Sequence, residues 1–168
     1  MLIKQTILTS ACLLGIKSSY KGKTSRQLLD SCWRENKSVC FIPFCPEQIT
    51  GFSTPRPPVE IKGGDGNDVL TGKAHVITHK GTDITDQFLV GLDDIKKIVA
   101  WTRPSLILTQ SKSPSCSCKG IYDGSFTHKL VPGYGVYAAF LEQEGFKLID
   151  IVDFNKKGHT FLNNNVCP

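Results

Sequence analysis

The segment DQFLVGLDDIKKIVAW at residues 86–101, followed by LIL at residues 106–108, carries the clearest secondary-structure signals in the chain. In the first run, apolar side chains recur every three or four residues, which predicts one amphipathic helix with Thr85 as its cap. The second run is short and wholly apolar, which predicts a buried strand. A helix that leads into a buried strand is typical of α/β proteins.

Outward from this pair, strand-like runs continue to alternate with helical patterns. This alternation predicts an α/β fold: a single Rossmann-like layered domain with a mainly parallel sheet, over residues 1–154. Residues 155–168, which include Cys167, are predicted to form a polar C-terminal tail that frays. The other predicted elements are strands at residues 2–8, 38–44, 59–61, 74–78 and 147–152, and helices at residues 25–36 and 134–144.

The composition excludes several classes of protein. Of the 168 residues, 40% are hydrophobic and 21% are charged, which is typical of a globular domain rather than a disordered chain. No apolar run approaches the ~20 residues of a membrane-spanning helix, so we expect no membrane partner. Polar residues interrupt the apolar N-terminus, which predicts a cytoplasmic protein without a signal peptide. The net charge of +5 is compatible with RNA or nucleotides, but the basic residues are scattered.

The chain has seven cysteines, an odd number at irregular spacing that does not predict a disulfide framework. Cys12, Cys45 and Cys116 each follow a predicted strand. Since the carboxyl ends of parallel strands meet at one crevice, these three thiols are predicted to converge there. Three thiolates would leave one iron of an iron–sulfur cluster open to a soft sulfur ligand. We expect Cys32 and Cys40 to be small buried side chains.

Two charged residues follow the second of these cysteines. Glu47 comes two residues after Cys45, so thiol and carboxylate can face one cleft, although a solvated loop acid has the same sequence. Arg56 lies in a loop that prolines stiffen, which lowers the entropy lost when its guanidinium is held in place. Such a guanidinium binds a phosphate or carboxylate of a ligand, or it pairs with Glu60 as a structural lock.

The sequence SPSCSC at residues 113–118 gathers hydroxyls and thiols in a tight turn after the strand at 106–108. Its donors can face a ligand, and a plain surface turn is the alternative. Cys118 is a second candidate metal ligand beside Cys116, but two cysteines do not complete a metal site.

Five motifs together resemble those of one family: SACLLG (residues 10–15), PFCPE (43–47), TPRPPVEI (54–61), SPSC (113–116) and IYDGSF (121–126). In this order, over about residues 7–150, the chain resembles the thiouracil desulfurase family, whose members are also called 4-thiouridine desulfidases. It departs from the family at Ser18 and Ser19, where many relatives have cysteine and arginine, and at Lys21, where they have aspartate.

The resemblance implies a cofactor and a set of site residues. Family members hold a [4Fe–4S] cluster by three cysteines, and a serine before the third ligand belongs to the site. Ser113 is the better match to that serine, and Ser115 is the second candidate. Together with the argument for Arg56 above, the predicted site residues are the metal ligands Cys12, Cys45 and Cys116, the catalytic Glu47 and Ser113, and the substrate-binding Arg56 and Ser115.

The implied reaction is a non-redox removal of sulfur from thiouracil or 4-thiouridine-type bases, which gives the oxo base and sulfide. The implied partner is a thiopyrimidine base, nucleoside or nucleotide, and the charge of +5 is also compatible with thiolated tRNA. Two alternatives stay open. A non-catalytic iron–sulfur protein, such as a sulfur carrier or sensor, needs the cysteines but not Glu47. A nucleotide-binding module without metal needs neither.

Overall fold

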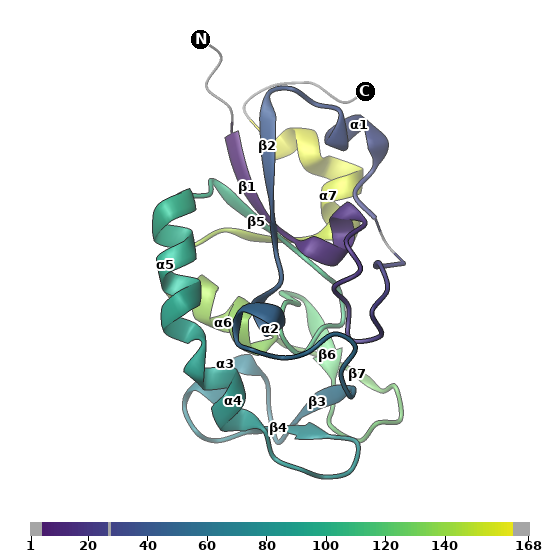
Figure 1. The fold of residues 1–168 in the computed structure, drawn as a ribbon, viewed down its shortest axis with the longest axis vertical. Helices are drawn as coiled ribbons and strands as arrows, with labels where there is room; N and C mark the ends of the chain where they lie inside the picture. Colours follow the sequence, from purple (N-terminus) through teal and green to yellow (C-terminus); the bar gives the residue numbers. More distant parts are fainter. Residues whose placement is uncertain (1–4, 27, 163–168) are drawn as a thin grey trace.

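A four-stranded parallel sheet forms the centre of the protein (Figure 1). The computed structural model describes residues 5–26 and 28–162. The strands lie in the order β2 (Val39–Phe44), β1 (Gln5–Ser10), β5 (Leu106–Thr109) and β8 (Leu148–Asp150). This confirms the predicted α/β class with a mainly parallel sheet, and the part of the first predicted strand before residue 5 lies outside the described residues.

The strand order places a crevice at one end of the sheet. Counted along the chain, the four strands lie in the order second, first, third, fourth. In doubly wound sheets of this order, connections leave in opposite directions from the first and third strands, and ligands bind outside the carboxyl ends there. A ligand site is therefore expected at the carboxyl ends of β1, β2 and β5.

Apolar residues cover both faces of the sheet because neighbouring residues of a strand point to opposite sides. On β1, Leu8 packs in one core cluster, with Val99 and Tyr137, whereas Ile7 packs in the other, with Phe154. Helices α5 (Leu92–Thr102) and α6 (Val136–Gln143) therefore contribute to the first cluster, and α7 (Ile151–Lys157) to the second (Figure 1).

The helix predicted over residues 86–101 is in fact two helices, α4 (Thr85–Val90) and α5, which meet at Gly91. A Cβ atom on Gly91 would lie 1.8 Å from Thr50 Cγ2, so the chain needs glycine where this junction passes residue 50. The predicted cap is also wrong, because Ile84 holds the N-cap position and Thr85 Oγ1 instead accepts a hydrogen bond from Val76 N at 2.9 Å.

The helix predicted over residues 25–36 shortens to α1 (Ser31–Arg34). The chain before it is held by backbone hydrogen bonds to the short helix η1 (Ala11–Leu14): Ser25 N donates to Cys12 O at 3.0 Å and Leu29 N to Leu13 O at 2.9 Å. These tertiary bonds replace the local bonds of a longer helix. Cys32 and Cys40 are exposed, so the prediction that both are buried is wrong.

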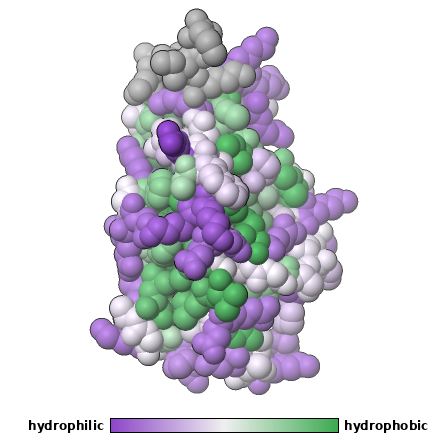
Figure 2. All heavy atoms as spheres, turned by 60° about the vertical axis from the view of Figure 1, so that its left-hand side comes forward, coloured by the Kyte–Doolittle hydropathy of each residue, from purple (hydrophilic) through white to green (hydrophobic). Residues whose placement is uncertain are grey.

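The remaining elements form a second layer at the lower end of the molecule in Figure 1. Two antiparallel pairs of strands dominate it, and the predicted strands near residues 59 and 75 form the first of them. Figure 2 shows an apolar area over the lower part of one face, with hydrophilic side chains around it. The elements are α2 (Pro46–Ile49), β3 (Val59–Lys62), α3 (Gly66–Leu70), β4 (His75–Thr78), β6 (Gly120–Tyr122) and β7 (Leu130–Pro132).

The C-terminal segment is packed as far as the structure describes it. The strand expected over residues 147–152 ends at Asp150, which caps α7 through a bond from Val152 N at 2.9 Å. α7 crosses the predicted boundary at residue 154 and continues into η2 (Gly158–Thr160), and Leu162 is buried. The division into a domain and a tail stays a prediction, and Cys167 lies outside the described residues.

Within residues 5–26 and 28–162, no helix combines the length and the apolar character that crossing a bilayer requires.

Candidate active site

Three cysteines lie where the central strands end. Cys12 lies in η1 directly after β1, Cys45 follows β2 and precedes α2, and Cys116 lies in the turn after β5. β1 lies between β2 and β5 and is paired with both in parallel register, so the three segments leave the sheet at the same edge. The thiols influence one another electrostatically, because ionised Cys45 and Cys12 both raise the pKa of Cys116. The structure thus brings the three predicted cysteines together.

All three thiols are free, and their surroundings disfavour ionisation. Burial, followed by the charge of Cys45, raises the pKa of Cys12 to about 11. Burial raises the pKa of Cys45, and Glu47 adds to that effect. The pKa of Cys116 lies well above its usual range because the thiol is buried and faces Cys45, Glu47 and Cys12. Although Arg56 opposes this effect at Cys12 and Cys45, the raised pKa values mean that the three sulfurs are neutral thiols at neutral pH.

Polar groups surround the sulfurs. Cys12 Sγ lies 3.7 Å from Gln110 Oε1, and Cys45 Sγ lies 3.7 Å from the carbonyl oxygen of Ser18. Arg56 Nη2 lies 4.0 Å from Cys45 Sγ, so one permanent positive charge faces the thiols. Gln110 directly follows β5, so the rule that strand ends converge could have identified it from the sequence.

Glu47 is held between two donors beside the cysteines. It lies in the first turn of α2, where Pro46 starts the helix at its favoured first position. Its Oε1 accepts a hydrogen bond from Ser115 Oγ, and its Oε2 accepts one from Arg56 Nε. The two charged side chains are largely buried, with 12% of Glu47 and 7% of Arg56 exposed. The alternative of a solvated loop acid is therefore wrong.

Arg56 connects Glu47 to the loops around it. Its Nη1 donates to Ser53 O at 3.2 Å and Thr54 Oγ1 at 3.1 Å, and its Nη2 donates to Ser18 O at 3.2 Å. The alternative of a structural lock with Glu60 is wrong, because the partner of Arg56 is Glu47. Glu60 Oε2 instead accepts from the backbone nitrogens of residues 124 and 126 at 3.1 and 2.9 Å.

The two candidate serines do different things. Ser115 is fully buried, and its hydroxyl donates to Glu47. Ser113 Oγ accepts bonds from Ser115 N at 3.2 Å and Cys116 N at 3.0 Å, so it closes the turn that carries the third cysteine. The resemblance favoured Ser113 over Ser115 as the serine of the site, but the hydroxyl in contact with Glu47 belongs to Ser115.

The N-terminus of α6 fixes the same turn. Val136 N donates to Pro114 O at 2.8 Å, Tyr137 N donates to Ser115 O at 3.0 Å, and Gly135 N donates to the carbonyl of residue 117 at 2.7 Å. These are amide groups that a helix leaves without internal partners, and here the turn supplies their acceptors. The placement of Cys116 is thus coupled to the position of a whole helix.

Cys118 lies in a different environment from Cys116. Its sulfur is 3.2 Å from Thr109 Oγ1, and burial together with Asp150 and Asp153 raises its pKa. Cys12 and Cys45 are among the main groups that raise the pKa of Cys116, whereas Asp150 and Asp153 are the main charged groups that raise the pKa of Cys118. Cys116 is therefore the third member of the thiol group.

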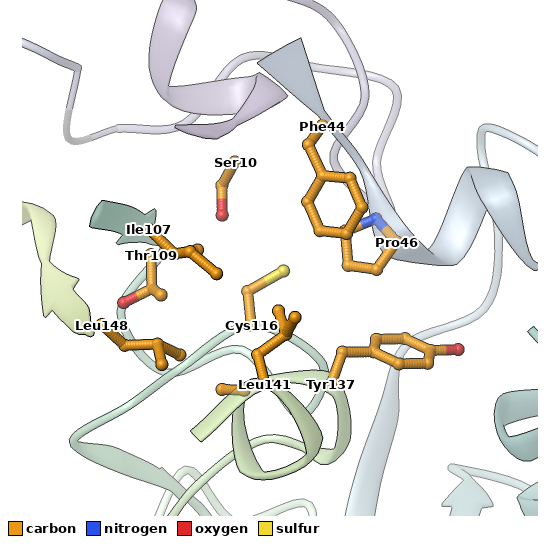
Figure 3. Close-up of a pocket in the computed structure, with 10 residues that line it drawn as sticks. Ser10, Phe44, Pro46, Ile107, Thr109, Cys116, Tyr137, Leu141 and Leu148 are labelled. Atoms are coloured by element: carbon orange, nitrogen blue, oxygen red, sulfur yellow. The ribbon is translucent and has the colours of Figure 1, made fainter. Parts of the chain in front are cut away.

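Two hollows flank the site. Figure 3 shows the smaller one around Cys116, whose sulfur points toward the side of Phe44 and Pro46. Its volume is about 10 Å³, which is room for about one water. The larger hollow, about 320 Å³, is lined by Glu47 and Arg56 and by apolar side chains that include Phe52 and Phe88. The ion pair therefore borders both the thiols and an open groove.

The donor set fits an iron–sulfur cluster. Among the described residues, no three His, Cys, Asp or Glu side chains lie close enough together to hold a single metal ion. Cys12, Cys45 and Cys116 are nonetheless near enough for their charges to interact, and all are free. Thiolates are the ligands of iron–sulfur clusters, and the metal charge would offset their mutual repulsion.

Comparison with known proteins gave three findings. The sequence model of the family described as 2-thiouracil desulfurase matches residues 7–152. The uncharacterized protein YbbK of Bacillus subtilis (strain 168) is 39% identical over 154 residues, which are 89% of this chain and 97% of YbbK. The solved structure of the [4Fe-4S]-dependent thiouracil desulfidase TudS is similar with a TM-score of 0.75 and 29% identity, over 94% of this chain and 97% of TudS.

The matched region contains the three converging cysteines and the buried Glu47–Arg56 pair. The similarity to TudS extends over the whole described fold rather than over one motif. Sequence and structure therefore agree, and the chain belongs to the 2-thiouracil desulfurase family.

Proposed function

We propose that this protein is a [4Fe–4S]-dependent desulfidase that removes sulfur from thiouracil-type bases. Water would supply the oxygen, so that a thiocarbonyl compound and water give the oxo base and hydrogen sulfide without oxidation or reduction. The observation that carries this proposal is the meeting of three free thiols, Cys12, Cys45 and Cys116, beside the buried carboxylate of Glu47. The similarity to TudS supports the same chemistry.

Cys12, Cys45 and Cys116 would hold the cluster as thiolates. When bound through three protein ligands, the cluster would supply one iron that acts as a Lewis acid toward the sulfur of the substrate. Binding of the cluster requires the three thiols to lose their protons, and their raised pKa values mean that those protons are released on assembly. Ser113 would keep Cys116 in place through its two bonds to the turn.

Glu47 would perform the proton transfers. Its carboxylate would take a proton from the attacking water or give one to the ring nitrogen. Ser115 and Arg56 donate to its two oxygens, one each, and so fix the orientation of the carboxylate. We therefore propose Ser115, rather than Ser113, as the hydroxyl that acts together with Glu47. Arg56 is proposed to contact the substrate from the edge of the groove that it lines.

The substrate is proposed to be a small thiopyrimidine. The groove beside Glu47 and Arg56 has a volume of about 320 Å³ and is lined by Phe52 and Phe88, which suits a flat ring. Ribose or phosphate groups would extend toward the open side of this groove. A cytoplasmic location stays a prediction.

The test is anaerobic reconstitution of the full chain with iron and sulfide, followed by incubation with 2-thiouracil, 4-thiouracil, 4-thiouridine and thiolated tRNA in separate reactions. We expect the thiocarbonyl absorbance of the free bases or nucleoside to fall while sulfide and the oxo base appear in equal amounts. A protein that holds the full cluster but converts none of these compounds would favour a sulfur carrier or sensor.

A further inference from the structure

A buried hydroxyl without a hydrogen-bond partner lies next to the proposed cluster ligands. Ser18 is only 1% exposed. Its Oγ has no hydrogen-bond partner within the described part of the chain. A buried donor that makes no bond loses the hydrogen bonds it had with water, so such groups are rare and call for an explanation.

The backbone of Ser18 is already part of the site. Its carbonyl oxygen lies 3.7 Å from Cys45 Sγ and accepts a bond from Arg56 Nη2 at 3.2 Å. The loop that holds it follows η1, the short helix that carries Cys12, and Ile16 N donates back to the carbonyl of residue 11 at 3.3 Å. In serine the hydroxyl and the carbonyl oxygen are both two bonds from Cα, so Oγ lies within a few ångströms of the carbonyl oxygen that contacts Cys45 Sγ. Rotation about one side-chain bond changes its direction.

We propose that Ser18 Oγ donates a hydrogen bond to a sulfur atom of the cluster beside Cys45. The proposal rests on the proposed function, because it needs the cluster that Cys12, Cys45 and Cys116 would hold. In the loaded protein, cluster sulfur would provide the acceptor that the protein itself does not provide. Hydrogen bonds to cluster sulfurs are one of the means by which a protein sets the reduction potential and retention of its cluster. Ser18 is thus a positioning residue for the cofactor.

The test compares wild type, Ser18→Ala and Ser18→Thr, each in the cluster-free and the reconstituted form. In the cluster-free form, Ser18→Ala removes a donor that has no partner, so its melting temperature should equal or exceed that of wild type. In the reconstituted form, the same change should speed iron loss to a chelator by about tenfold. Ser18→Thr keeps the hydroxyl and should retain iron as wild type does.

The reduction potential gives a second readout that a merely structural role would not change. Loss of the donor should make the cluster harder to reduce, by up to about tenfold in the equilibrium constant, which corresponds to about 59 mV for one electron. Ser19→Ala is the matched control, because Ser19 Oγ already accepts a bond from Lys23 N at 3.1 Å in the loop. It should leave the potential and the iron loss unchanged.

The outcomes separate this proposal from the proposed function. A wild-type protein that takes up no cluster would overturn both. A loaded Ser18→Ala protein with unchanged potential and unchanged iron loss would overturn the role of Ser18 and leave the proposed function standing. A lowered melting temperature in cluster-free Ser18→Ala would show that the hydroxyl has a partner in the protein, which also overturns the proposal.

Discussion

At the scale of single residues, the carboxylate of Glu47, with hydrogen bonds from Ser115 and Arg56, distinguishes this site from one that only binds a metal cluster. A cluster ligand set needs only thiols, yet the chain also buries Glu47 and Arg56, at 12% and 7% exposure. Burial of a charged pair is costly unless both partners are bonded, and here Ser115 and the surrounding carbonyls complete the bonding. This bonding supports the proposed role of Glu47 in proton transfer.

Replacement of this carboxylate tests that role. Glu47→Gln keeps the shape of the side chain but cannot exchange a proton, so the cluster-loaded variant should lose at least ~100-fold in desulfuration rate. Iron content should stay that of wild type. Rates from initial sulfide release, with iron measured on the same samples, provide the check. Glu144→Gln is the control, since Glu144 forms a surface pair with Lys96. Near-normal turnover in Glu47→Gln would remove the acid–base role.

The two serines should be separable by the same assays. Ser115→Ala removes the donor to Glu47 and should slow turnover by about tenfold or more with the cluster retained. Ser113→Ala removes the acceptor for two turn amides and should cost about 1 kcal/mol of unfolding free energy, with faster cluster loss. Urea unfolding and iron content distinguish the variants. The reverse pattern would make Ser113, rather than Ser115, the serine that acts with Glu47.

The sequence predicted which segments lie close together, but it did not predict the individual hydrogen bonds between their side chains. The positions of Cys12, Cys45 and Cys116 after three strands were enough to predict their convergence. The partner of Arg56 was not predictable, because it depends on how the loop at 53–56 passes α2. Side-chain bonds between distant segments follow from the packed fold rather than from local sequence.

At the scale of elements, the start of α6 and the turn at 113–117 behave as one unit. Amides of the first turn of α6 donate to carbonyls of that turn. Gly135, the N-cap of α6, lies against the turn so closely that a Cβ would be 2.6 Å from the carbonyl carbon of Ser115. The position of Cys116 therefore depends on the absence of a side chain at residue 135.

Gly135→Ala should accordingly damage the site through the backbone. We expect a loss of about 1–3 kcal/mol in unfolding free energy and a lower iron content after reconstitution. Gly72→Ala is the control, because its Cβ would meet nothing within 4 Å and the cost is only that of its positive φ of 74°. That variant should lose about 1–2 kcal/mol but keep full iron content. Equal iron content in the two variants would contradict the coupling of helix and turn.

The errors in predicting helices share a physical cause. Residues 86–101 have helical periodicity throughout, but the helix is divided at Gly91, where Thr50 leaves no room for a side chain. Residues 25–36 also have a helical pattern, but bonds to η1 hold their first part outside a helix. In both places contacts between distant segments override local preference.

At the scale of the whole molecule, the strand order produces the site. The sequence predicted the strands and their parallel arrangement, but not that β1 lies between β2 and β5. That order places the ends that carry Cys12, Cys45 and Cys116 at one edge of the sheet, where α2 adds Glu47. The second layer, with its two antiparallel strand pairs, was only partly predicted because short strands have weak sequence signals.

The central claim is that three cysteines hold one [4Fe–4S] cluster at this edge. The most direct measurement is iron and acid-labile sulfide per chain after anaerobic reconstitution of wild type, Cys116→Ser and Cys118→Ser. The two thiols are two residues apart, but Cys12 and Cys45 are among the main charges that raise the pKa of Cys116, whereas the main charges that raise the pKa of Cys118 are those of Asp150 and Asp153. We predict about four irons per chain in wild type and Cys118→Ser, and little iron in Cys116→Ser. Full iron in Cys116→Ser together with loss in Cys118→Ser would contradict the ligand set.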